Sequence, residues 1–528
     1  MARSNARGKR RASAFAVAMV AIMALAWWSA ACGEKKGGDQ ESVAAAKPMQ
    51  LKVMEFNIEY GGTGISFKKV VEAVEAADPD VVGLEEAETN SGRLAKALGW
   101  PYYSNGMQVV SKYPILEPSA DGVYALIEVQ PGYVVALSNV HLPSAPYGPY
   151  ATKKGSPVDK VVAMEERVRV PAVERQLQEL PKLAEAGTPT FMVGDFNSPS
   201  MLDYTEATVG KRPQITYPIE WPVSKAVLDA GMRDSWRDVY PDPVANPGLT
   251  WWAGRPKVAG DWNPSDRNPQ DRIDFIYAGG PSKTVASQIV GEKGGPEVAI
   301  AISPWPSDHR AVVSTFEVTP APMPTLVSVD RWLVTQGDEL KVTSHASGGG
   351  GEKVALVTSG GDPAAAVTSQ PTGADGTAGG VLTFATTELP PGAYEAVLLD
   401  AGGGELAKVP FWVRAKDAKV ALTTDKPTYA GGDPITVTWA NAPANRWDWI
   451  GVYKASAADP NVDWYLIWQY TGGAMSGSVH GLPAGTMSLE KGTIEGSPWP
   501  LPPGKYVVYY LLADGYESVA GAEFTVTK

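Results

Sequence analysis

The stretch TFMVGDFNSPS, residues 190–200, changes abruptly from an apolar strand to a polar turn. Residues 190–193 have the composition of a short buried strand. Gly194, Asp195, Phe196 and Asn197 follow, so an acid and an amide flank one aromatic residue. Asp, Asn, Gly and Pro all favour turns, and the stretch alone fits an ordinary strand end. A functional interpretation needs partner residues elsewhere in the chain.

Other apolar segments end in the same way. The ionisable or amide residues at these ends are Asn57 in MEFNIE, Glu86 in VVGLEEAE, His141 in LSNVHL, Asp274 in DRIDFIY, and Asp308 and His309 in SPWPSDHRAVV. If these strands share one core, their ends converge on one rim of the sheets. The pattern therefore predicts a polar site assembled from distant parts of the chain.

Strand-like and helix-like segments alternate from Leu51 onward. Strands are expected at residues 51–58, 79–86, 107–115, 124–129, 133–142, 189–196, 271–278 and 311–318. A helix capped by Ser66 is expected over 66–78, and one long helix ending at Gly187 over 165–187. Loops rich in Pro, Gly, Tyr and Trp are expected at 142–160 and 241–270, and loops of that length are usually functional or lie at a rim.

Residues 51–318 resemble the endonuclease/exonuclease/phosphatase superfamily, the fold of pancreatic deoxyribonuclease, abasic-site endonucleases and neutral sphingomyelinases. The segments FNIEY, GLEEAE, QVVSKYPI, SNVHL, GDFNSPS, DRIDFIY and SDHRAVV carry the resemblance, in the order found in that family. Each segment alone is weak, whereas the ordered set is specific. The resemblance implies an α/β, four-layer αββα sandwich of the deoxyribonuclease I type over residues 50–319.

The resemblance also implies a divalent cation that neutralises the phosphoric ester. Glu86 would be the main Mg²⁺ ligand, Asn57 an oxygen ligand or its positioner, and Asp308 a further metal ligand. Mn²⁺ and Ca²⁺ are alternatives to Mg²⁺. Glu59 stands two places after Asn57, where the family has an Asp or another residue, and its longer side chain argues against a second metal contact there.

Catalytic roles follow from the same resemblance. Asp195 would orient and deprotonate the attacking water, and Asn197 would hold that water or a phosphate oxygen. On an extended chain both side chains lie on one side, with Phe196 pointing into the core. His141 and His309 would donate hydrogen bonds to phosphate oxygens, with Asp274 orienting one histidine.

Structural alternatives exist for several of these residues. Asn57 and Asn197 also fit ordinary turns, and Asp274 could pair with Arg272 or Arg310 at the surface. Trp251 and Trp252 fit either substrate stacking or loop packing. The chain has four histidines, and two of them fall on family motifs, which argues against chance.

The composition of the sequence changes at residues 318–325, VTPAPMPT, and helical periodicity is absent after them. The prolines in this segment predict a short stiff spacer. Two all-β, immunoglobulin-like sandwich domains are expected after it, over 325–415 and 417–528. The segments 389–413 and 501–526 resemble each other and read as equivalent closing hairpins. The region shows no acid–histidine cluster, so no catalytic residue is expected beyond His309. Its dense tryptophans favour core packing over sugar or partner binding.

The N-terminus predicts export. Residues 1–11 are basic, 12–28 are apolar, and Cys32 is the only cysteine in the chain. We expect an export signal over 1–32 with lipid attachment at Cys32, and a tether over 33–49. The usual Leu-like residue three places before the cysteine is replaced by Ser29, so secretion after cleavage near Ala31, or an uncleaved anchor, are the alternatives.

These features together predict an exported metal-dependent hydrolase of phosphoric esters, at the bacterial cell envelope or outside the cell. The expected partners are the ester itself (nucleic acid, phospholipid or small phosphate ester) and, through the lipid, the membrane; no obligate protein partner is evident. The net charge of −12 argues weakly against broad binding to long polyanions. The alternative function is a non-catalytic surface binding protein on the same fold.

Overall fold

In the computed structural model, residues 46–528 are described except for 120–121, 259–262, 266, 347–349, 374–378, 457–458, 461–462, 473–480 and 491–497. The export signal, Cys32 and most of the tether lie outside the described residues. None of the helices in this described part is long and apolar enough to span a membrane.

Two seven-stranded sheets form the N-terminal half of the described chain. The first has the order β12 (Val298–Ile302), β11 (Ser282–Glu292), β13 (Ala311–Val318), β1 (Met49–Asn57), β2 (Val81–Glu85), β4 (Val109–Ser111) and β3 (Tyr102–Ser104). The second has the order β5 (Ile115–Leu116), β6 (Ala125–Gln130), β7 (Tyr133–His141), β8 (Thr190–Asp195), β10 (Asp274–Gly279) and β9 (Arg233–Asp234), with β14 (Ala321–Pro322) on β7. Both are mixed, since β1–β2 and β7–β8 are parallel while β1–β13 and β8–β10 are antiparallel.

A buried apolar cluster fills the space between the two sheets. Val53 and Val81 of the first sheet belong to the same cluster as Leu137, Phe191 and Val193 of the second. Such alternation of inward and outward side chains is what the period-two strand pattern dictates. The Asn139 amide also crosses between the sheets, donating to the carbonyl oxygens of Leu84 and Met107 at 2.7 and 3.2 Å.

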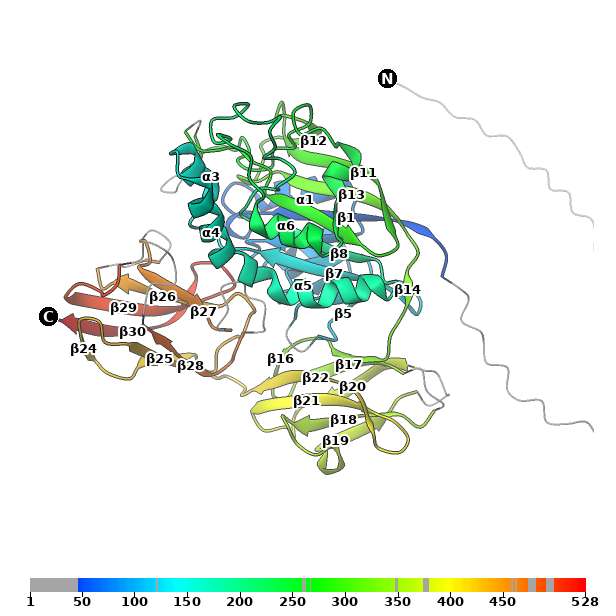
Figure 1. The fold of residues 1–528 in the computed structure, drawn as a ribbon. Coiled ribbons are helices and arrows are strands. Elements are labelled where there is room, and N and C mark those ends of the chain that lie inside the picture. The colour runs from blue at the N-terminus through cyan, green and yellow to red at the C-terminus, as the bar shows by residue number, and fades with distance from the viewer. Residues whose placement is uncertain are drawn as a thin grey trace, which may run out of the picture. The chain divides into compact units, whose positions relative to one another are not determined.

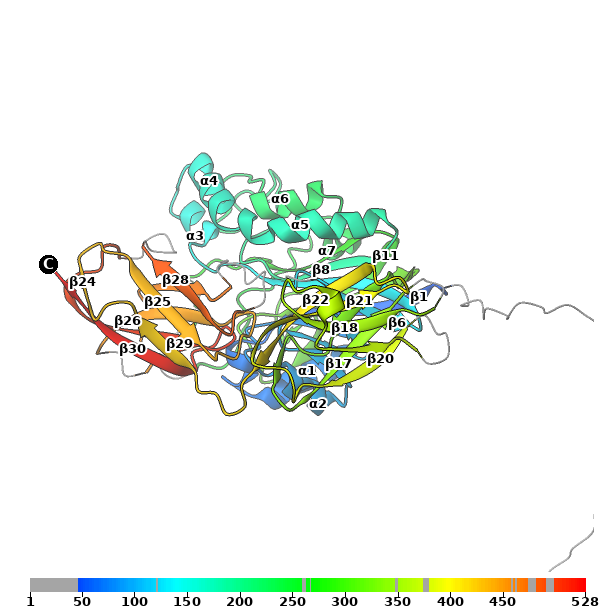
Figure 2. The same cartoon turned by 90° about the horizontal axis from the view of Figure 1, so that it is seen from below.

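Helices cover the outer faces of both sheets (Figure 2). On the first sheet lie α1 (Phe67–Ala77) and α2 (Ser91–Leu98). On the side of the second sheet lie α3 (Gly148–Lys153), α4 (Val158–Val168), α5 (Val170–Glu185) and α6 (Pro222–Asp229). The short helices η1 (Tyr60–Gly62) and α7 (Ser235–Val239) complete this half. The layers run helix, sheet, sheet, helix, so the predicted αββα sandwich is confirmed.

Two local predictions about helices differ from the structure. Ser66 occupies the N-cap position of α1, but its side chain accepts no capping hydrogen bond. The single helix predicted over 165–187 is part of two helices, α4 and α5, which meet at Arg169. Pro171, in the first turn of α5, has no N–H for the hydrogen bond that would continue α4. The buried Arg169 pairs with Glu165 at 2.8 Å, which fixes the junction.

The predicted proline spacer is wrong. Ala321 and Pro322 form the edge strand β14 on β7, and the Met323 N–H donates to the Gly132 carbonyl at 2.8 Å. Met323 and Leu326 are buried in a cluster with residues of β6 and β7. Proline is compatible with an edge strand because the missing N–H faces away from the ladder. The segment therefore belongs to the second sheet.

Two pairs of β-sheets follow, each with three strands facing five (Figure 1). The first pair is β15 (Leu326–Val329), β17 (Glu339–His345) and β20 (Gly379–Ala385) against β16 (Leu333–Thr335), β22 (Glu405–Arg414), β21 (Gly392–Leu399), β18 (Lys353–Thr358) and β19 (Thr368–Pro371), with the short helix η2 (Pro363–Ala365). The second pair is β23 (Ala421–Thr424), β25 (Ile435–Ala440) and β28 (Gly485–Leu489) against β24 (Thr428–Ala430), β30 (Ser518–Thr527), β29 (Gly504–Leu511), β26 (Trp449–Lys454) and β27 (Ile467–Tyr470). We call the second pair the C-terminal sandwich.

The repeated segments 389–413 and 501–526 occupy matching places in the two pairs. They form the hairpins β21–β22 and β29–β30, and each has a register shift at the end of its first strand, at Leu398/Leu399 and at Tyr510/Leu511. The tryptophans of the last region pack mainly in the interior, as expected: Trp439, Trp447 and Trp449 are buried.

Candidate active site

The site residues stand where strands of the two sheets begin or end. Asn57 ends β1, Glu86 follows β2, His141 ends β7, Asp195 ends β8 and Asp274 begins β10. The parallel pairing of β7 and β8 brings His141 opposite Asp195, and the antiparallel pairing of β8 and β10 brings Asp274 opposite the same residue. The sequence pattern therefore converges as predicted because sheet register places these ends together.

Gly194 allows β8 to approach β7 at this point. Its φ is 140°, and a Cβ atom there would lie 1.9 Å from the carbonyl oxygen of Val140. Any side chain would push the two strands apart and move Asp195 away from His141. The glycine in VGDFN is thus a structural requirement of the site.

Asp195 is the centre of the cluster. It is 1% exposed, and its Oδ2 lies 3.6 Å from His141 Nε2 and 3.7 Å from His309 Nε2. The amides of Asn57 and Asn197 donate to the same oxygen at 3.2 and 3.1 Å. Burial raises the pKa of Asp195 to about 6, with Asp274 adding to the rise and the two histidines opposing it. A carboxylate with this pKa is suited to accept a proton near neutral pH.

Asn197 has a different backbone from the extended one expected. Its φ is 46°, in the left-handed region that Asn tolerates, so the chain turns immediately after β8. Its N–H donates to Asp195 Oδ1 at 2.8 Å, and its Nδ2 donates to the Leu142 carbonyl and to Asp195. Asn197 therefore positions Asp195 directly. Phe196 points into the core as predicted, edge-on to Phe275.

His309 is held by Asp274. Its Nδ1 lies 2.9 and 3.1 Å from the two carboxylate oxygens of Asp274, and both residues are buried. Burial opposes a charge on the ring, but the carboxylates of Asp274, Asp195 and Asp308 outweigh burial and raise the pKa of His309 well above its usual value. With Nδ1 committed to Asp274, Nε2 is the ring nitrogen directed at Asp195.

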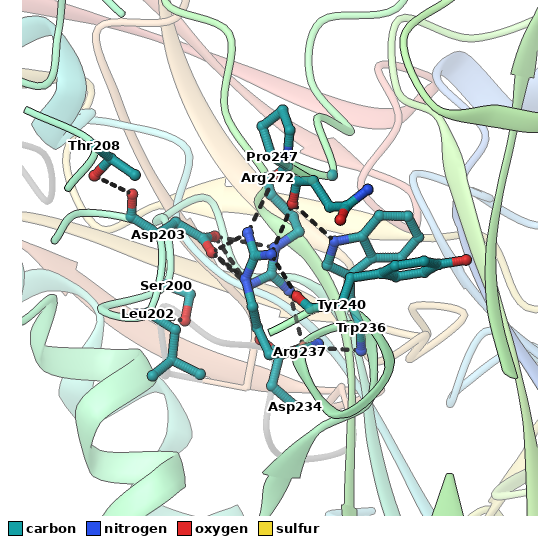
Figure 3. Close-up of polar contacts among 12 residues, drawn as sticks. Ser200, Leu202, Asp203, Thr208, Asp234, Trp236, Arg237, Tyr240, Pro247 and Arg272 are labelled. Atoms are coloured by element: carbon teal, nitrogen blue, oxygen red, sulfur yellow. Dashed lines mark hydrogen bonds and ion pairs between the residues drawn. The ribbon is translucent and has the colours of Figure 1, made fainter. Parts of the chain in front are cut away.

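The surface pairing considered for Asp274 does not occur. Arg310 pairs with Glu292 at 2.5 Å, and Arg272 pairs with Asp203 and Asp234 at 2.9 and 2.8 Å. Figure 3 shows the Arg272 guanidinium among these two acids and the neighbouring Arg237. This buried network fixes the start of β10. Because both arginines pair with other acids, Asp274 pairs with His309 instead.

The acids Glu59, Glu86 and Asp308 gather next to the catalytic cluster. Asn57 Nδ2 donates to Glu86 Oε1 at 3.3 Å, and Asn57 Oδ1 accepts from the Glu59 N–H at 3.1 Å. Glu59 accepts from the Asp308 N–H at 3.0 Å and pairs with Arg255 at 2.6 Å. In this arrangement the Asn57 amide orients Glu86. Of the two roles predicted for Asn57, the structure therefore favours positioning of the metal ligand over direct binding of the metal.

Arg255 and Asp308 affect the electrostatics of this cluster in opposite directions. Burial and the charge of Asp308 raise the pKa of Glu59 to about 8, although Arg255 opposes the rise. Burial raises the pKa of Glu86 as well, and Asp308 adds to it. Crowded carboxylates of this kind are stabilised by a bound cation, and their oxygens are the donors that Mg²⁺ prefers.

A second group can also hold a metal ion. Asp195, Asp274 and His309 each offer one ligand atom, and these atoms lie within 4.8 Å of one another. In the structure, however, both oxygens of Asp274 contact His309 Nδ1, so a metal bound there would replace that hydrogen bond. The part of the chain that the structure describes therefore offers two adjacent acidic groups for divalent cations.

Some residues of the site were not foreseen from the sequence. Glu55 and Glu85 are fully buried beside Asp195 and Asp274, and burial raises the pKa of both, that of Glu85 to about 8. Ser307 donates to the Asn57 carbonyl at 2.7 Å and accepts from the His309 N–H at 3.0 Å. A charged residue at an inward position of an apolar strand, as in MEFN, was the signal available for Glu55.

Trp251 lies at the site rather than only in its loop. Its Nε1 donates to Asp308 Oδ2 at 3.2 Å, and its ring centroid is 6.4 Å from that of His309. The backbone of Trp251 also forms an isolated bridge with His309. The long loop 241–270 thus contributes to the site through a direct contact, which favours the functional interpretation of that loop.

Comparison with known proteins gives the same assignment. The model of the Endonuclease/Exonuclease/phosphatase family matches residues 54–309. An uncharacterized protein of Caenorhabditis elegans is 30% identical over 293 residues, which is 50% of this chain and 91% of that protein. The chain belongs to the endonuclease/exonuclease/phosphatase family.

Two solved structures are similar to parts of the chain. An endonuclease/exonuclease/phosphatase from Beutenbergia cavernae is 17% identical and covers 69% of this chain and 99% of its own, with a TM-score of 0.30. A mannosyl-6-phosphatase of Bacteroides thetaiotaomicron is 14% identical and covers 50% and 99%, also with a TM-score of 0.30.

Members of the family are hydrolases of phosphoric esters and generally depend on a divalent metal. The arrangement suits that chemistry. A buried carboxylate with a pKa of about 6, Asp195, lies between two histidine Nε2 atoms that can donate to an anion. The acids that can hold a cation lie directly beside them.

Proposed function

We propose that this chain is a Mg²⁺-dependent hydrolase of phosphoric esters. The observation that carries the proposal is the position of Asp195, whose Oδ2 faces the Nε2 atoms of His141 and His309 at 3.6 and 3.7 Å. In the proposed reaction Asp195 takes a proton from the attacking water. The two histidines donate hydrogen bonds to phosphate oxygens as negative charge grows there.

The metal in this proposal is held by Glu86 and Asp308, with Asn57 orienting Glu86. The donor set supports it, because these oxygens lie in a crowded acidic cluster in which Arg255 pairs with Glu59 and His309 lies 3.9 Å from Asp308. When bound, Mg²⁺ supplies positive charge that offsets the charge of the ester. Mn²⁺ or Ca²⁺ are alternatives at the same oxygens.

The location proposed for this activity is the cell envelope, through lipid attachment at Cys32. The basic residues 1–11, the apolar run 12–28 and the lone cysteine support it. Metabolic labelling with an alkyne fatty acid, followed by comparison of the chain with its Cys32→Ser variant, tests the attachment. Labelling that survives in the variant would exclude Cys32 as the lipidated residue.

The experiment for the activity is a substrate panel measured with Mg²⁺ and after removal of metal by a chelator. The panel contains duplex DNA, RNA, sphingomyelin, inositol phosphates and a chromogenic phosphodiester. We expect hydrolysis of at least one ester, its loss with chelator, and its recovery when Mg²⁺ is added back. A folded protein that hydrolyses none of them would favour the alternative, a non-catalytic binding protein on the same fold.

A further inference from the structure

The C-terminal sandwich contacts the catalytic cluster. Asp514, in the turn between β29 and β30, places its Oδ2 3.2 Å from His141 Nδ1. The two residues are separated by 373 positions in the sequence, and they belong to the same compact unit, Ala45–Lys528. The region beyond His309, in which no catalytic residue is expected, therefore reaches the site through this contact.

The turn that carries Asp514 is held firmly by its own sandwich. The Asp514 N–H donates to the Trp447 carbonyl at 2.9 Å, and the preceding N–H, of Ala513, donates to Asp448 Oδ1 at 2.9 Å. Trp449 Nε1 donates to the Gly515 carbonyl at 2.9 Å, and the Tyr470 hydroxyl donates to Asp514 Oδ1. Asp514 therefore presents its second oxygen to His141 from a fixed position.

The turn also approaches the other side of the site closely. A Cβ atom on Gly515 would lie 2.8 Å from the Glu88 side chain, so a larger residue there would require Glu88 to shift. Arg446 of the same sandwich is buried and donates to Met107 Sδ at 3.4 Å, next to β4. Contacts on both flanks of Asp514 thus hold the sandwich against the rim of the sheets.

A pocket of about 190 Å³ lies where the two meet. The catalytic side contributes Glu86 and His141, and the sandwich contributes Asp514 and five aromatic residues: Trp449, Tyr465, Trp468, Tyr470 and Tyr516. Among the described residues lining it there is no Lys or Arg. An aromatic lining suits the organic part of a small molecule. Binding of long nucleic acids without regard to sequence relies on Lys and Arg side chains, which this lining lacks.

We propose that the C-terminal sandwich completes the active site: Asp514 is a positioning residue for His141, and the aromatic wall receives the organic part of a small phosphoric ester. This inference rests on the proposed function and adds its substrate class. Asp514 fixes Nδ1 of the ring, so that Nε2 faces Asp195 and the phosphate, in the same way that Asp274 fixes His309. Burial opposes a charge on the ring, but the hydrogen bond and charge of Asp514, together with Asp195 and Glu86, outweigh burial and raise the pKa of His141 to about 10.

The first test is a double-mutant cycle on the full mature chain. Asp514→Ala and Asp514→Asn should each lower kcat by about 10- to 100-fold, and Asp514→Glu should recover part of the loss. In a His141→Ala background Asp514→Ala should cause no further loss, because it acts through that ring. The matched control is Asp400→Asn, in the equivalent turn of the preceding sandwich, where Asp400 Oδ1 accepts only from nearby backbone. Additive losses, or kcat within twofold of wild type, would overturn the role of Asp514.

The second test separates the aromatic wall from the catalytic group. Trp468→Ala should raise KM for a small aryl phosphodiester about three- to tenfold with kcat within twofold, because it removes a ring that contacts substrate in ground and transition states alike. Trp464→Ala is the control, since Trp464 is 77% exposed and does not line the pocket. Equal KM values for the two variants would refute the assignment of the wall.

A readout without substrate distinguishes this inference from the proposed function. The chain has four histidines, so the ring nitrogens can be followed individually by ¹⁵N NMR, with His141→Ala giving the assignment. Asp514→Asn should move the His141 Nδ1 signal and leave the other three unchanged, while Asp400→Asn should move none. An unmoved His141 signal overturns the contact. A moved signal in a protein that hydrolyses no ester would mean that the contact is correct and the proposed function wrong.

Discussion

Replacing Asp274 by Asn should separate catalysis from stability. Asp274 is 1% exposed, and both of its oxygens contact His309 Nδ1, at 2.9 and 3.1 Å. Asn keeps the shape but removes the charge that orients and stabilises the imidazolium. Losing a carboxylate that positions another group lowers activity by about 10- to 100-fold. Because Asp274 makes two contacts in a buried pair, we expect kcat/KM to fall by about 100-fold, which corresponds to about 2.7 kcal/mol of transition-state stabilisation.

The structure also sets an upper limit on this loss. Asp195 and Asp308 lie 3.7 and 3.9 Å from His309 Nε2, so the ring keeps two carboxylates nearby when Asp274 is neutralised. The free energy of unfolding should change little, because the lost hydrogen bond is offset by relief of repulsion with Glu55, whose pKa is raised in part by Asp274.

The assay compares kcat/KM and thermal melting for Asp274→Asn and for a structural control, Asp203→Asn. Asp203 accepts from Arg237 Nε at 2.8 Å and from Arg272 Nε at 3.0 Å, both buried, and lies outside the catalytic cluster. Breaking this network should cost about 3–5 kcal/mol of stability while kcat per folded molecule stays near wild type. If Asp274→Asn retains kcat/KM within threefold, or if both variants lose only stability, the orienting role of Asp274 is refuted.

Four further outcomes are expected. Glu86→Gln should weaken Mg²⁺ binding by calorimetry and lower turnover, and normal turnover of chelator-treated wild type would contradict the metal assignment. Asp195→Asn and His309→Ala should each lower kcat by about 10²-fold with melting near wild type, and near-normal turnover in either would exclude the mechanism. Met323→Ala should lower stability by about 2 kcal/mol because the side chain is buried against β6 and β7, whereas no change would restore the spacer interpretation. The pKa of Asp203 is lowered, because Arg272 and Arg237 outweigh burial. The stability that Asp203 contributes is therefore present above its unfolded pKa of about 4 and is lost as the pH falls through its folded pKa. The Tm of Asp203→Asn should fall less steeply with decreasing pH than the Tm of wild type, and an equally steep fall would contradict this.

The fold of residues 50–319 could be predicted from the sequence because the patterns that indicate it are local. Strand periodicity and a polar residue at each strand end are both short-range patterns, and the family resemblance supplies their order. The errors arose where tertiary contacts override local preference. Prolines 320, 322 and 324 favour a spacer by composition, but an edge of the second sheet accepts Pro322 without losing a ladder bond. The helical periodicity of residues 165–187 favours one helix, but Pro171 cannot continue α4 and the chain forms two helices that meet at Arg169.

Asp514 could not be recognised by the same method, and the reason is physical. Asp514 and Gly515 form an Asp-Gly pair, which is ordinary in a hairpin turn, and Asp400 lies in the equivalent turn of a similar hairpin. Asp400 accepts from the backbone of its own turn. The backbone of the turn that carries Asp514 is instead held by Trp447, Asp448 and Trp449, so Asp514 Oδ2 contacts His141 while its Oδ1 accepts from the Tyr470 hydroxyl. What differs is the surface that the turn meets, which depends on how distant parts of the chain pack together. A residue whose role is defined only by that packing carries no local signature, so its assignment rests on the contact itself and on the experiments that perturb it.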